Sequence, residues 1–563
     1  MDSELLYQAT ELLEAGTLAF LRELDQAIRP ERGTPLLPSR VLVLGGLCLG
    51  NELGPKTITH LAKMMSEATQ GQLQMLYGVP AGPGHSQGPA LEPPSEWQLY
   101  RLFDALATVL GRQHRSRELD GLQGKKLAAA QRAWARRVAR GRALLGTDND
   151  RDTQIAMSIC LLRDTAPAPP AGAPHTTDTT EVEADCRPIS QARIKRGEFA
   201  ADGDARWRSK LVGDRDSEAP GEQERKGKPA ESEPRKQHYF GFGDDVIGGT
   251  TDNASYVYAH AVFGANRYDV PLSVRLVEML QASGHPVTEL IGDRGFSQDS
   301  KWMAALRKQN VMGVFDLKSP QIHPYPTWRG CLVLPSGIYL PTLPERLRLI
   351  ERPGLQAPVE KKQAYRKAIE ERSIYALVAH GKPTPGQVRL SSPVLRRKAL
   401  NALGCPKVPV SMRRRDPGLP VCDGQHGDDE ACCIQTATLK AEEIPSIFQF
   451  PFWGTPEWEE KYALRTNVER GFSSLKNPDV IGLTKGQYHY RHIPNVSLLV
   501  TLMWGAHNLR LMIKRKRDAA QAAAAMLRKH RLQPRRSSQV ALVTEPSSAL
   551  LGQGGSGEDS RAP

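Results

Sequence analysis

The order of strand-like and helix-like segments between residues 175 and 318 constrains the fold of this chain more than any other feature. A short β-prone segment that contains Asp178 is followed by two runs rich in aromatic and β-branched residues, 238–249 and 255–264. A helix, a short apolar strand that ends at Asp293, a second helix and a last strand then alternate. This order predicts an α/β fold in which helices cover a mixed sheet.

Three acids stand out as candidate catalytic and metal-binding residues. Asp178 and Asp293 lie in or directly after predicted central strands, where side chains open into the crevice at the sheet edge. Glu469 lies on a predicted amphipathic helix far along the chain. Carboxylates that converge from distant segments are what oxygen-seeking divalent cations require. Taken singly, each acid has a structural alternative, as a turn cap for Asp178 and as an ion-pair partner of a nearby Arg for the other two.

Residues 461–476, KYALRTNVERGFSSLK, predict one helix with two distinct faces. Four polar residues fall at offsets 0, 3, 7 and 14 and share an arc of roughly 60° at about 100° per residue. They are Tyr462, Arg465, Glu469 and Lys476. The adjoining arc carries the apolar residues Leu464, Val468, Phe472 and Leu475. Such a helix packs on a core and presents a carboxylate beside two cations, although a solvated face with ion pairs is the alternative interpretation.

The acids and this helix together resemble a known family. The order Asp178, Asp293 within LIGDRGF, and the helix at 461–476 is similar to that of the DDE transposases of bacterial insertion sequences. Within that family the chain resembles the group with the signature Y-x2-R-x3-E-x6-K, which it matches at every position. The resemblance covers about residues 176–515. It implies a ribonuclease-H-like mixed sheet, with a mainly β insertion before the last catalytic helix.

The resemblance also implies roles for the site residues. Asp178, Asp293 and Glu469 would bind two Mg²⁺ or Mn²⁺ ions, which activate an attacking hydroxyl and stabilise the leaving 3′ oxygen in phosphodiester displacement. The DNA phosphates around the transposon end would be contacted by Tyr462, Arg465 and Lys476. Water would be the first nucleophile and the exposed 3′-hydroxyl the second. A homodimer in a synaptic complex is the expected assembly.

Residues 175–177 depart from the family pattern. The sequence HTT stands where apolar residues are expected before the first acid. Asp185, Asp244 and Asp245 therefore remain rivals of Asp178 for that position.

Composition suggests how the rest of the chain is organised. Residues 1–165 predict an all-α N-terminal domain, a candidate for DNA binding, in which residues 1–30 form one helix. Within it, a pair of short helices broken near Thr69–Gly71 is compatible with a helix-turn-helix, although such pairs are common in structural roles. The remaining predicted parts are a catalytic core in two pieces (166–318 and 451–530), a mobile loop (195–237), a β-rich inserted subdomain (319–450) and a disordered tail (531–563).

The charge balance favours polyanionic partners, because 75 Lys and Arg oppose 62 Asp and Glu. No apolar run predicts a membrane span or a signal peptide, so we expect a cytoplasmic protein. The resemblance implies that it is bacterial and nucleoid-associated when bound to DNA. A late cluster gives candidate zinc ligands without a paired knuckle, and unligated thiols are the expected state. Its members are Cys405, Cys422, His426, Cys432 and Cys433. His489 and His492 are predicted to be surface or phosphate-adjacent residues and not metal ligands.

The leading hypothesis is a DNA transposase that cleaves the ends of its own insertion element and joins them to target DNA in a metal-dependent reaction. One alternative is a catalytically inactive DNA-binding protein descended from such an enzyme. Another is a metal-dependent DNA nuclease without strand transfer.

Overall fold

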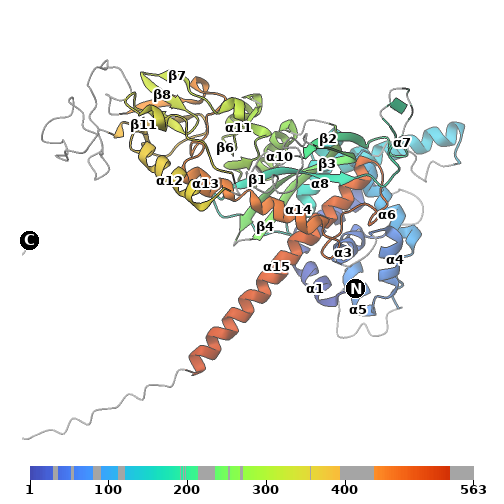
Figure 1. Ribbon diagram of the computed structural model, residues 1–563. Coiled ribbons are helices and arrows are strands. Elements are labelled where there is room, and N and C mark those ends of the chain that lie inside the picture. The colour runs from blue at the N-terminus through green and yellow to red at the C-terminus, as the bar shows by residue number, and fades with distance from the viewer. Residues whose placement is uncertain are drawn as a thin grey trace, which may run out of the picture. The chain divides into compact units, whose positions relative to one another are not determined.

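The computed structural model shows a mixed α/β protein (Figure 1). Its residues fall into two compact units, Met1–Ile513 and Lys514–Pro563. The structure describes the chain except for residues 30–35, 52–55, 80–89, 112–120, 191, 194–195, 197, 199, 213–234, 252–253, 267–269, 299, 355–356, 394–435 and 533–563. The cysteine cluster at 405–433 and most of the predicted tail lie outside the described residues.

The described part of residues 1–165 is helical, as predicted. Its helices are α1 (Ser3–Leu13), α2 (Thr17–Ile28), α3 (Ser39–Leu49), α4 (Ile58–Ser66), α5 (Gln70–Tyr77), α6 (Glu96–Val109), α7 (Gly124–Leu144) and α8 (Asp150–Leu162). The apolar faces of these helices, except α7, share one hydrophobic core with the first half of α15 (Ile493–Leu532), which contributes Leu498, Leu502 and Ala506. The domain boundary at residue 165 stays a prediction.

The prediction of a single helix over residues 1–30 was wrong. α1 ends at Leu13 and α2 begins at Thr17, because the carboxylate of Asp164 accepts hydrogen bonds from the backbone N–H and the hydroxyl of Thr17. A Cβ atom at Gly16 would lie 2.0 Å from Oδ2 of Asp164. Glycine at this position therefore lets the acid cap the start of α2.

A six-stranded mixed sheet lies at the centre of the larger unit. Its strands are β1 (His175–Glu183), β2 (Arg206–Val212), β3 (Arg235–Thr251), β4 (Ala254–Gly264), β5 (Glu289–Gly292) and β6 (Met312–Phe315). The hydrogen-bonded order is β2-β3-β1-β5-β6, with β4 also paired to β3. β3 is antiparallel to β1, β2 and β4, whereas β1, β5 and β6 run parallel to one another.

The predicted mobile loop at 195–237 was wrong in part. Residues 206–212 form β2, which pairs with residues 235–241 of β3. Backbone pairing with a long neighbouring strand orders this charged segment, and the ring of Trp207 packs beside that of Phe240 in β3 with centroids 5.5 Å apart. Residues 213–234 lie outside the described part of the chain.

Helices cover both faces of the sheet (Figure 1). Adjacent residues of β3 point to opposite sides, so that Val246 packs with α14 (Thr466–Lys476) and α15, while Ile247 packs with α8 and α10 (Val270–Ala282). α11 (Ser300–Lys308) packs against α10 and β6. The sheet is therefore the middle layer of three.

The segment 319–450 contains two small sheets and one helix among its described residues. One sheet is formed by β7 (Tyr325–Trp328), β8 (Cys331–Leu334) and β9 (Gly337–Tyr339), and the other by β10 (Val378–Ala379), β11 (Gln387–Ser391) and β12 (Ala437–Lys440), beside α12 (Val359–Ser373). Short 3₁₀ helices are η2 (Phe296–Gln298), η3 (Ser319–Gln321), η4 (Glu345–Leu347) and η7 (Ala441–Glu443). Both sheets share a hydrophobic core with β5 and β6.

The predicted single helix at 461–476 is divided in two. α13 (Pro456–Ala463) and α14 are separated by Leu464 and Arg465, where i→i−3 hydrogen bonds replace the α-helical pattern. The longest helix, α15, is apolar first and basic later, as predicted. By length and composition alone, the segment Ile493–Arg528 of α15 is long and apolar enough to cross a membrane, which was not predicted. In this structure 83% of its most apolar stretch is buried within the protein.

Candidate catalytic site

Asp178 and Asp293 come from neighbouring parallel strands. Thr176 of β1 is in register with Ile291 of β5, so Asp178 and Asp293 each lie two residues further toward the same edge of the sheet. Burial, with a smaller contribution from the charges of Asp293 and Glu469, raises the pKa of Asp178 to about 6, although Arg465 opposes the shift. Asp178 therefore lies close enough to both other acids to interact with their charges.

Arg465 joins the first acid to the last one. Its Nη1 lies 2.8 Å from Oδ2 of Asp178, and its Nη2 lies 2.7 Å from Oε1 of Glu469. The Asp178 side chain is 18% exposed and that of Glu469 is 48% exposed, so the cluster opens to solvent on the side of α14. A planar guanidinium can hold two carboxylates at once, which the point charge of a lysine does less well.

The turn between α13 and α14 brings Arg465 into this position. The N–H of Arg465 donates to the carbonyl of Tyr462 at 3.0 Å, and the N–H of Val468 donates to the carbonyl of Arg465 at 3.1 Å. These i→i−3 bonds tighten the chain at this point. The ring of Tyr462 stacks on Trp458 with centroids 4.6 Å apart, and the guanidinium of Arg465 lies 5.9 Å from the Tyr462 ring. Burial raises the pKa of Tyr462 to about 12, so its phenol stays protonated at neutral pH.

The apolar face of α14 packs as predicted. Val468 and Leu475 are buried, and Phe472 packs beside them on the core that includes Trp504 of α15. Leu464, in the turn, packs instead on the core of the opposite sheet face. Lys476 is half-buried in the last turn of α14. The predicted apolar face is therefore present along α14. Tyr462 lies on α13, on the other side of the tight turn, so it does not belong to the same helix face as the polar residues of α14.

Polar residues replace apolar ones in β1 without exposing the strand. His175 and Thr177 are both completely buried. Nε2 of His175 lies 2.9 Å from Nε2 of His285, and the hydroxyl of Thr177 donates to Asp245 at 3.2 Å. Burial lowers the pKa of His175 to about 3, so this histidine is neutral and packs as a polar core residue.

The three rivals of Asp178 have other partners. Asp244 is fully buried and accepts from the indole of Trp504 at 2.9 Å, with Nδ1 of His260 at 2.7 Å from its other oxygen. Asp245 is fully buried and accepts from Ser273 at 2.6 Å. Asp185 lies 3.1 Å from Nδ1 of His489.

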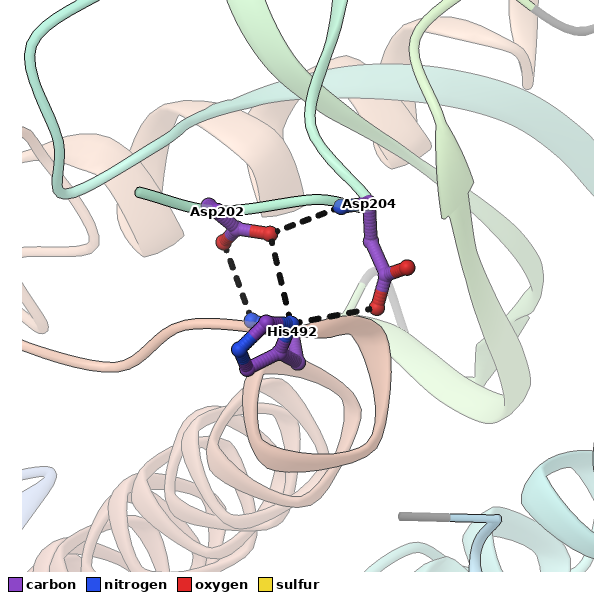
Figure 2. Close-up of side chains that lie close together, drawn as sticks. All are labelled: Asp202, Asp204 and His492. Carbon is purple, nitrogen blue, oxygen red and sulfur yellow. Dashed lines mark hydrogen bonds and ion pairs between the residues drawn. The ribbon is translucent and has the colours of Figure 1, made fainter. Parts of the chain in front are cut away.

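A second group of metal-capable side chains lies at the start of α15 (Figure 2). The donor atoms of Asp202, Asp204 and His492 all lie within 4.8 Å of one another, so this group could hold a metal ion. The prediction that His492 is a surface or phosphate-adjacent residue and not a metal ligand stays a prediction, and its side chain is 36% exposed. His492 adopts a left-handed conformation with φ of 69°, which turns its ring toward the two acids.

These two acids are also hydrogen-bonded to backbone. Asp202 accepts from the N–H of His492 at 2.9 Å, and Asp204 accepts from the N–H of Ile493 at 3.0 Å. Hydrogen bonding with His492 lowers the pKa of Asp204. Negative charge at a helix N-terminus is stabilised by the unpaired N–H groups and the helix dipole. The geometry of this group is accounted for by capping of α15.

The carboxylates at the sheet edge fit divalent cations by donor type. Asp178, Asp293 and Glu469 supply the oxygen ligands that Mg²⁺ and Mn²⁺ prefer. The raised pKa of Asp178 reflects burial first and repulsion by the other two acids second, and a bound cation would favour its ionised form. Their donor atoms do not form a group within 4.8 Å, and Arg465 bonds to both Asp178 and Glu469. Arg465 bonds to one oxygen of each of these two carboxylates, so a metal ion at this site would compete with Arg465 for them.

Sequence reasoning missed one acid beside this site. Asp316 directly follows β6, and its side chain is 13% exposed. It accepts from the indole of Trp453 at 2.7 Å and lies 3.7 Å from Arg294. The signal was present, because the strand VMGVFD ends in an acid in the same way as the strand before Asp293.

Comparisons with known proteins do not assign this chain to a family. No family model matches the chain, and no curated protein matches it. A solved structure that is similar is a cryo-EM structure of a piggyBac transposase synaptic complex with hairpin DNA, at 10% identity and a TM-score of 0.28, covering 84% of this chain and 79% of that chain. A likeness this weak supports no inference about fold or function. Membership in the transposases of bacterial insertion sequences stays a prediction.

Proposed function

We propose that this protein is a DNA transposase that cleaves the ends of its insertion element and transfers them to target DNA with divalent metal ions. The observation that carries the proposal is the meeting of three acids at one sheet edge. Asp178 on β1 and Asp293 after β5 share an edge by strand register, and Glu469 on α14 reaches them through Arg465. Three segments far apart in the sequence thus supply the acids of the signature.

The strand order supports the fold implied by the resemblance. A strand that bears the first acid, two antiparallel strands, and then two strands parallel to the first give the order β4-β3-β1-β5-β6. This is the order expected of a ribonuclease-H-like sheet. The assignment of Asp178 as the first acid is supported by the burial of Asp244 and Asp245 and by their existing hydrogen bonds.

Asp178, Asp293 and Glu469 would hold the metal ions in this proposal. When bound, these ions supply an activated hydroxyl nucleophile and stabilise the leaving 3′ oxygen. The chain's own residues bind and orient the substrate. Once Arg465 releases a carboxylate, its guanidinium can form two hydrogen bonds to a DNA phosphate. The same side chain would then contact the acids in the free protein and the substrate in the complex.

Tyr462 and Lys476 complete the proposed phosphate contacts. The phenol of Tyr462 is protonated at neutral pH and can donate a hydrogen bond to a phosphate oxygen. Lys476 lies at the other end of α14 and would contribute a point charge. The proposal also keeps the predicted domain boundaries, a synaptic homodimer and a bacterial cytoplasmic location.

The test is nicking of supercoiled DNA that carries the element ends. We expect wild-type protein to nick it with Mg²⁺ or Mn²⁺, and Glu469→Gln to lose at least about a thousandfold in rate, which corresponds to about 4 kcal/mol of transition-state stabilisation. Glu457→Gln on the exposed face of α13 is the matched control and should nick like wild type.

The outcomes separate the alternatives. Equal nicking by Glu469→Gln would contradict the site assignment. DNA binding without nicking in either metal would favour an inactive DNA-binding descendant. A second assay with a pre-cut 3′-hydroxyl end reports joining, and nicking without joining would favour a nuclease that lacks strand transfer.

A further inference from the structure

Helix α7 has an unusual charge. Its 21 residues carry seven Lys and Arg side chains and no acid. It is also the least buried of the N-terminal helices, since Gly141 is its one buried residue. A helix of this composition cannot form ion pairs between its own residues, so its positive charge can be neutralised only by other groups.

The cations lie on one face of α7. At about 100° per residue, Lys125, Arg132, Arg136 and Arg140 fall within an arc of roughly 80°. All four side chains are exposed. We call these four residues the α7 cationic stripe.

The opposite face of α7 attaches the helix to the protein. Gly141 packs so closely that a Cβ atom there would lie 3.0 Å from Val109 of α6 and 3.1 Å from Ile28 of α2. The close approach fixes the direction in which the stripe points, away from the helical core.

The stripe is free of internal ion pairs. None of its four members has a salt bridge within the described part of the chain, whereas Arg142, at the end of the same helix, pairs with Asp150. A row of unneutralised cations on a fixed helix is complementary to a polyanion and not to an apolar or a cationic surface.

The predicted helix-turn-helix does not offer a comparable surface. α5, which would be its second helix, contains no Lys or Arg. The side-chain amide of Gln72 in α5 is buried and donates to the carbonyl of Met1 and the hydroxyl of Ser3. The hydrogen-bonding capacity of this helix is thus used inside the protein.

We infer that the α7 cationic stripe binds the phosphate backbone of double-stranded DNA without reading its sequence. The choice of DNA as the polyanion rests on the proposed function. With a rise of 1.5 Å per residue, the stripe extends over about 22 Å, and Arg132, Arg136 and Arg140 follow one another at about 6 Å. Duplex DNA presents one charge per roughly 1.7 Å of its axis, so every member of the stripe can find a phosphate.

Binding to a DNA duplex of arbitrary sequence tests this inference, with the full chain and with EDTA present so that cleavage plays no part. The triple variant Arg132→Gln/Arg136→Gln/Arg140→Gln should lower the slope of log affinity against log salt by about 3. Between 50 and 200 mM salt, wild-type affinity should therefore fall about 40-fold more than that of the variant.

Two matched variants separate charge from packing. Arg132→Lys/Arg136→Lys/Arg140→Lys keeps the charge and should keep the wild-type slope. Lys361→Gln/Arg366→Gln/Lys367→Gln removes three cations from α12, whose sequence also contains acids, and should leave the slope unchanged.

The inference fails if the α7 and α12 glutamine variants change the slope equally, if the α7 variant changes nothing, or if wild-type protein does not bind the duplex. Stronger binding to a duplex of RNA than of DNA would also overturn it. Loss of nicking in Glu469→Gln is measured separately with metal present. Failure of the stripe and failure of the proposed catalytic site therefore give different results.

Discussion

Acids gather at two places in this fold, and their partners differ in kind. At the start of α15, Asp202 and Asp204 accept hydrogen bonds from the backbone N–H groups of His492 and Ile493. At the ends of β1 and β5, Asp178 faces a side chain, Arg465, and two other acids. Backbone partners are fixed by the fold, whereas a side-chain partner can leave. The comparison teaches that proximity of acids is a poor guide to function unless their partners are identified.

The comparison is tested most strongly by exchanging one acid in each place for its amide. Asp178→Asn should reduce metal-dependent DNA nicking at least about a thousandfold, because it removes a proposed ligand. Asp202→Asn should instead lower the free energy of unfolding by about 2 kcal/mol, because it weakens charge-assisted bonds at a buried helix start. Nicking assays and urea unfolding of both variants check this prediction.

Each variant serves as the control for the other. The nicking rate per folded molecule of Asp202→Asn should equal that of wild type. Metal-dependent nicking that is lost in folded Asp202→Asn and retained in Asp178→Asn would move the metal site to the start of α15.

The pH dependence of stability gives the next largest effect. The folded pKa of Asp178, about 6, lies above its ordinary value of 3.8, so the unfolded chain ionises first as pH rises. Metal-free wild-type protein should therefore lose up to about 3 kcal/mol of stability between pH 4 and 6 through this one group. Urea unfolding in EDTA across this range measures the loss.

Asp178→Asn provides the reference for this measurement. Its stability curve should lack this fall, although loss of the Arg465 partner shifts the whole curve by a constant amount. Parallel curves for variant and wild type would show that Asp178 ionises normally in the folded protein, and the electrostatic coupling at the sheet edge would then be absent.

The smallest expected effect concerns the acid that α15 covers. Trp504→Phe removes one hydrogen bond from Asp244. This loss should lower the free energy of unfolding by about 1 to 2 kcal/mol, in addition to the effect of the smaller ring. Trp458→Phe is the matched control, because Trp458 is equally buried and its indole nitrogen has no partner among the described residues. Equal losses of stability in the two variants, measured by urea unfolding, would contradict a role of the indole in holding Asp244.

The sequence predicted much of this fold because its strongest patterns are local. The strands that precede Asp293 and Asp316, and the helices that cover them, follow from apolar runs and helical spacing. The breaks at Gly16 and at Leu464–Arg465 were missed, because each depends on a tertiary partner, Asp164 in the first case and the acids at the sheet edge in the second.

The candidate site was predictable to a smaller extent. Spacing pointed to Glu469 and Arg465, but their shared contact with Asp178 depends on chain folding over a long separation. The grouping of His492 with Asp202 was not predictable from spacing, because the two lie on segments joined only in the folded chain. The strand at 206–212 did carry a signal, since charged and uncharged residues alternate in RWRSKLV.

The contact between Arg465 and Asp178 joins residues 287 positions apart in the chain. Contacts of such long range form late, because the entropy of closing the intervening chain must be overcome first. A nascent or truncated chain that ends at α13 contains Asp178 and Asp293 but neither Arg465 nor Glu469. The DNA cleavage proposed for this site therefore cannot begin during synthesis before Arg465 and Glu469 have been added and have folded back onto the sheet edge.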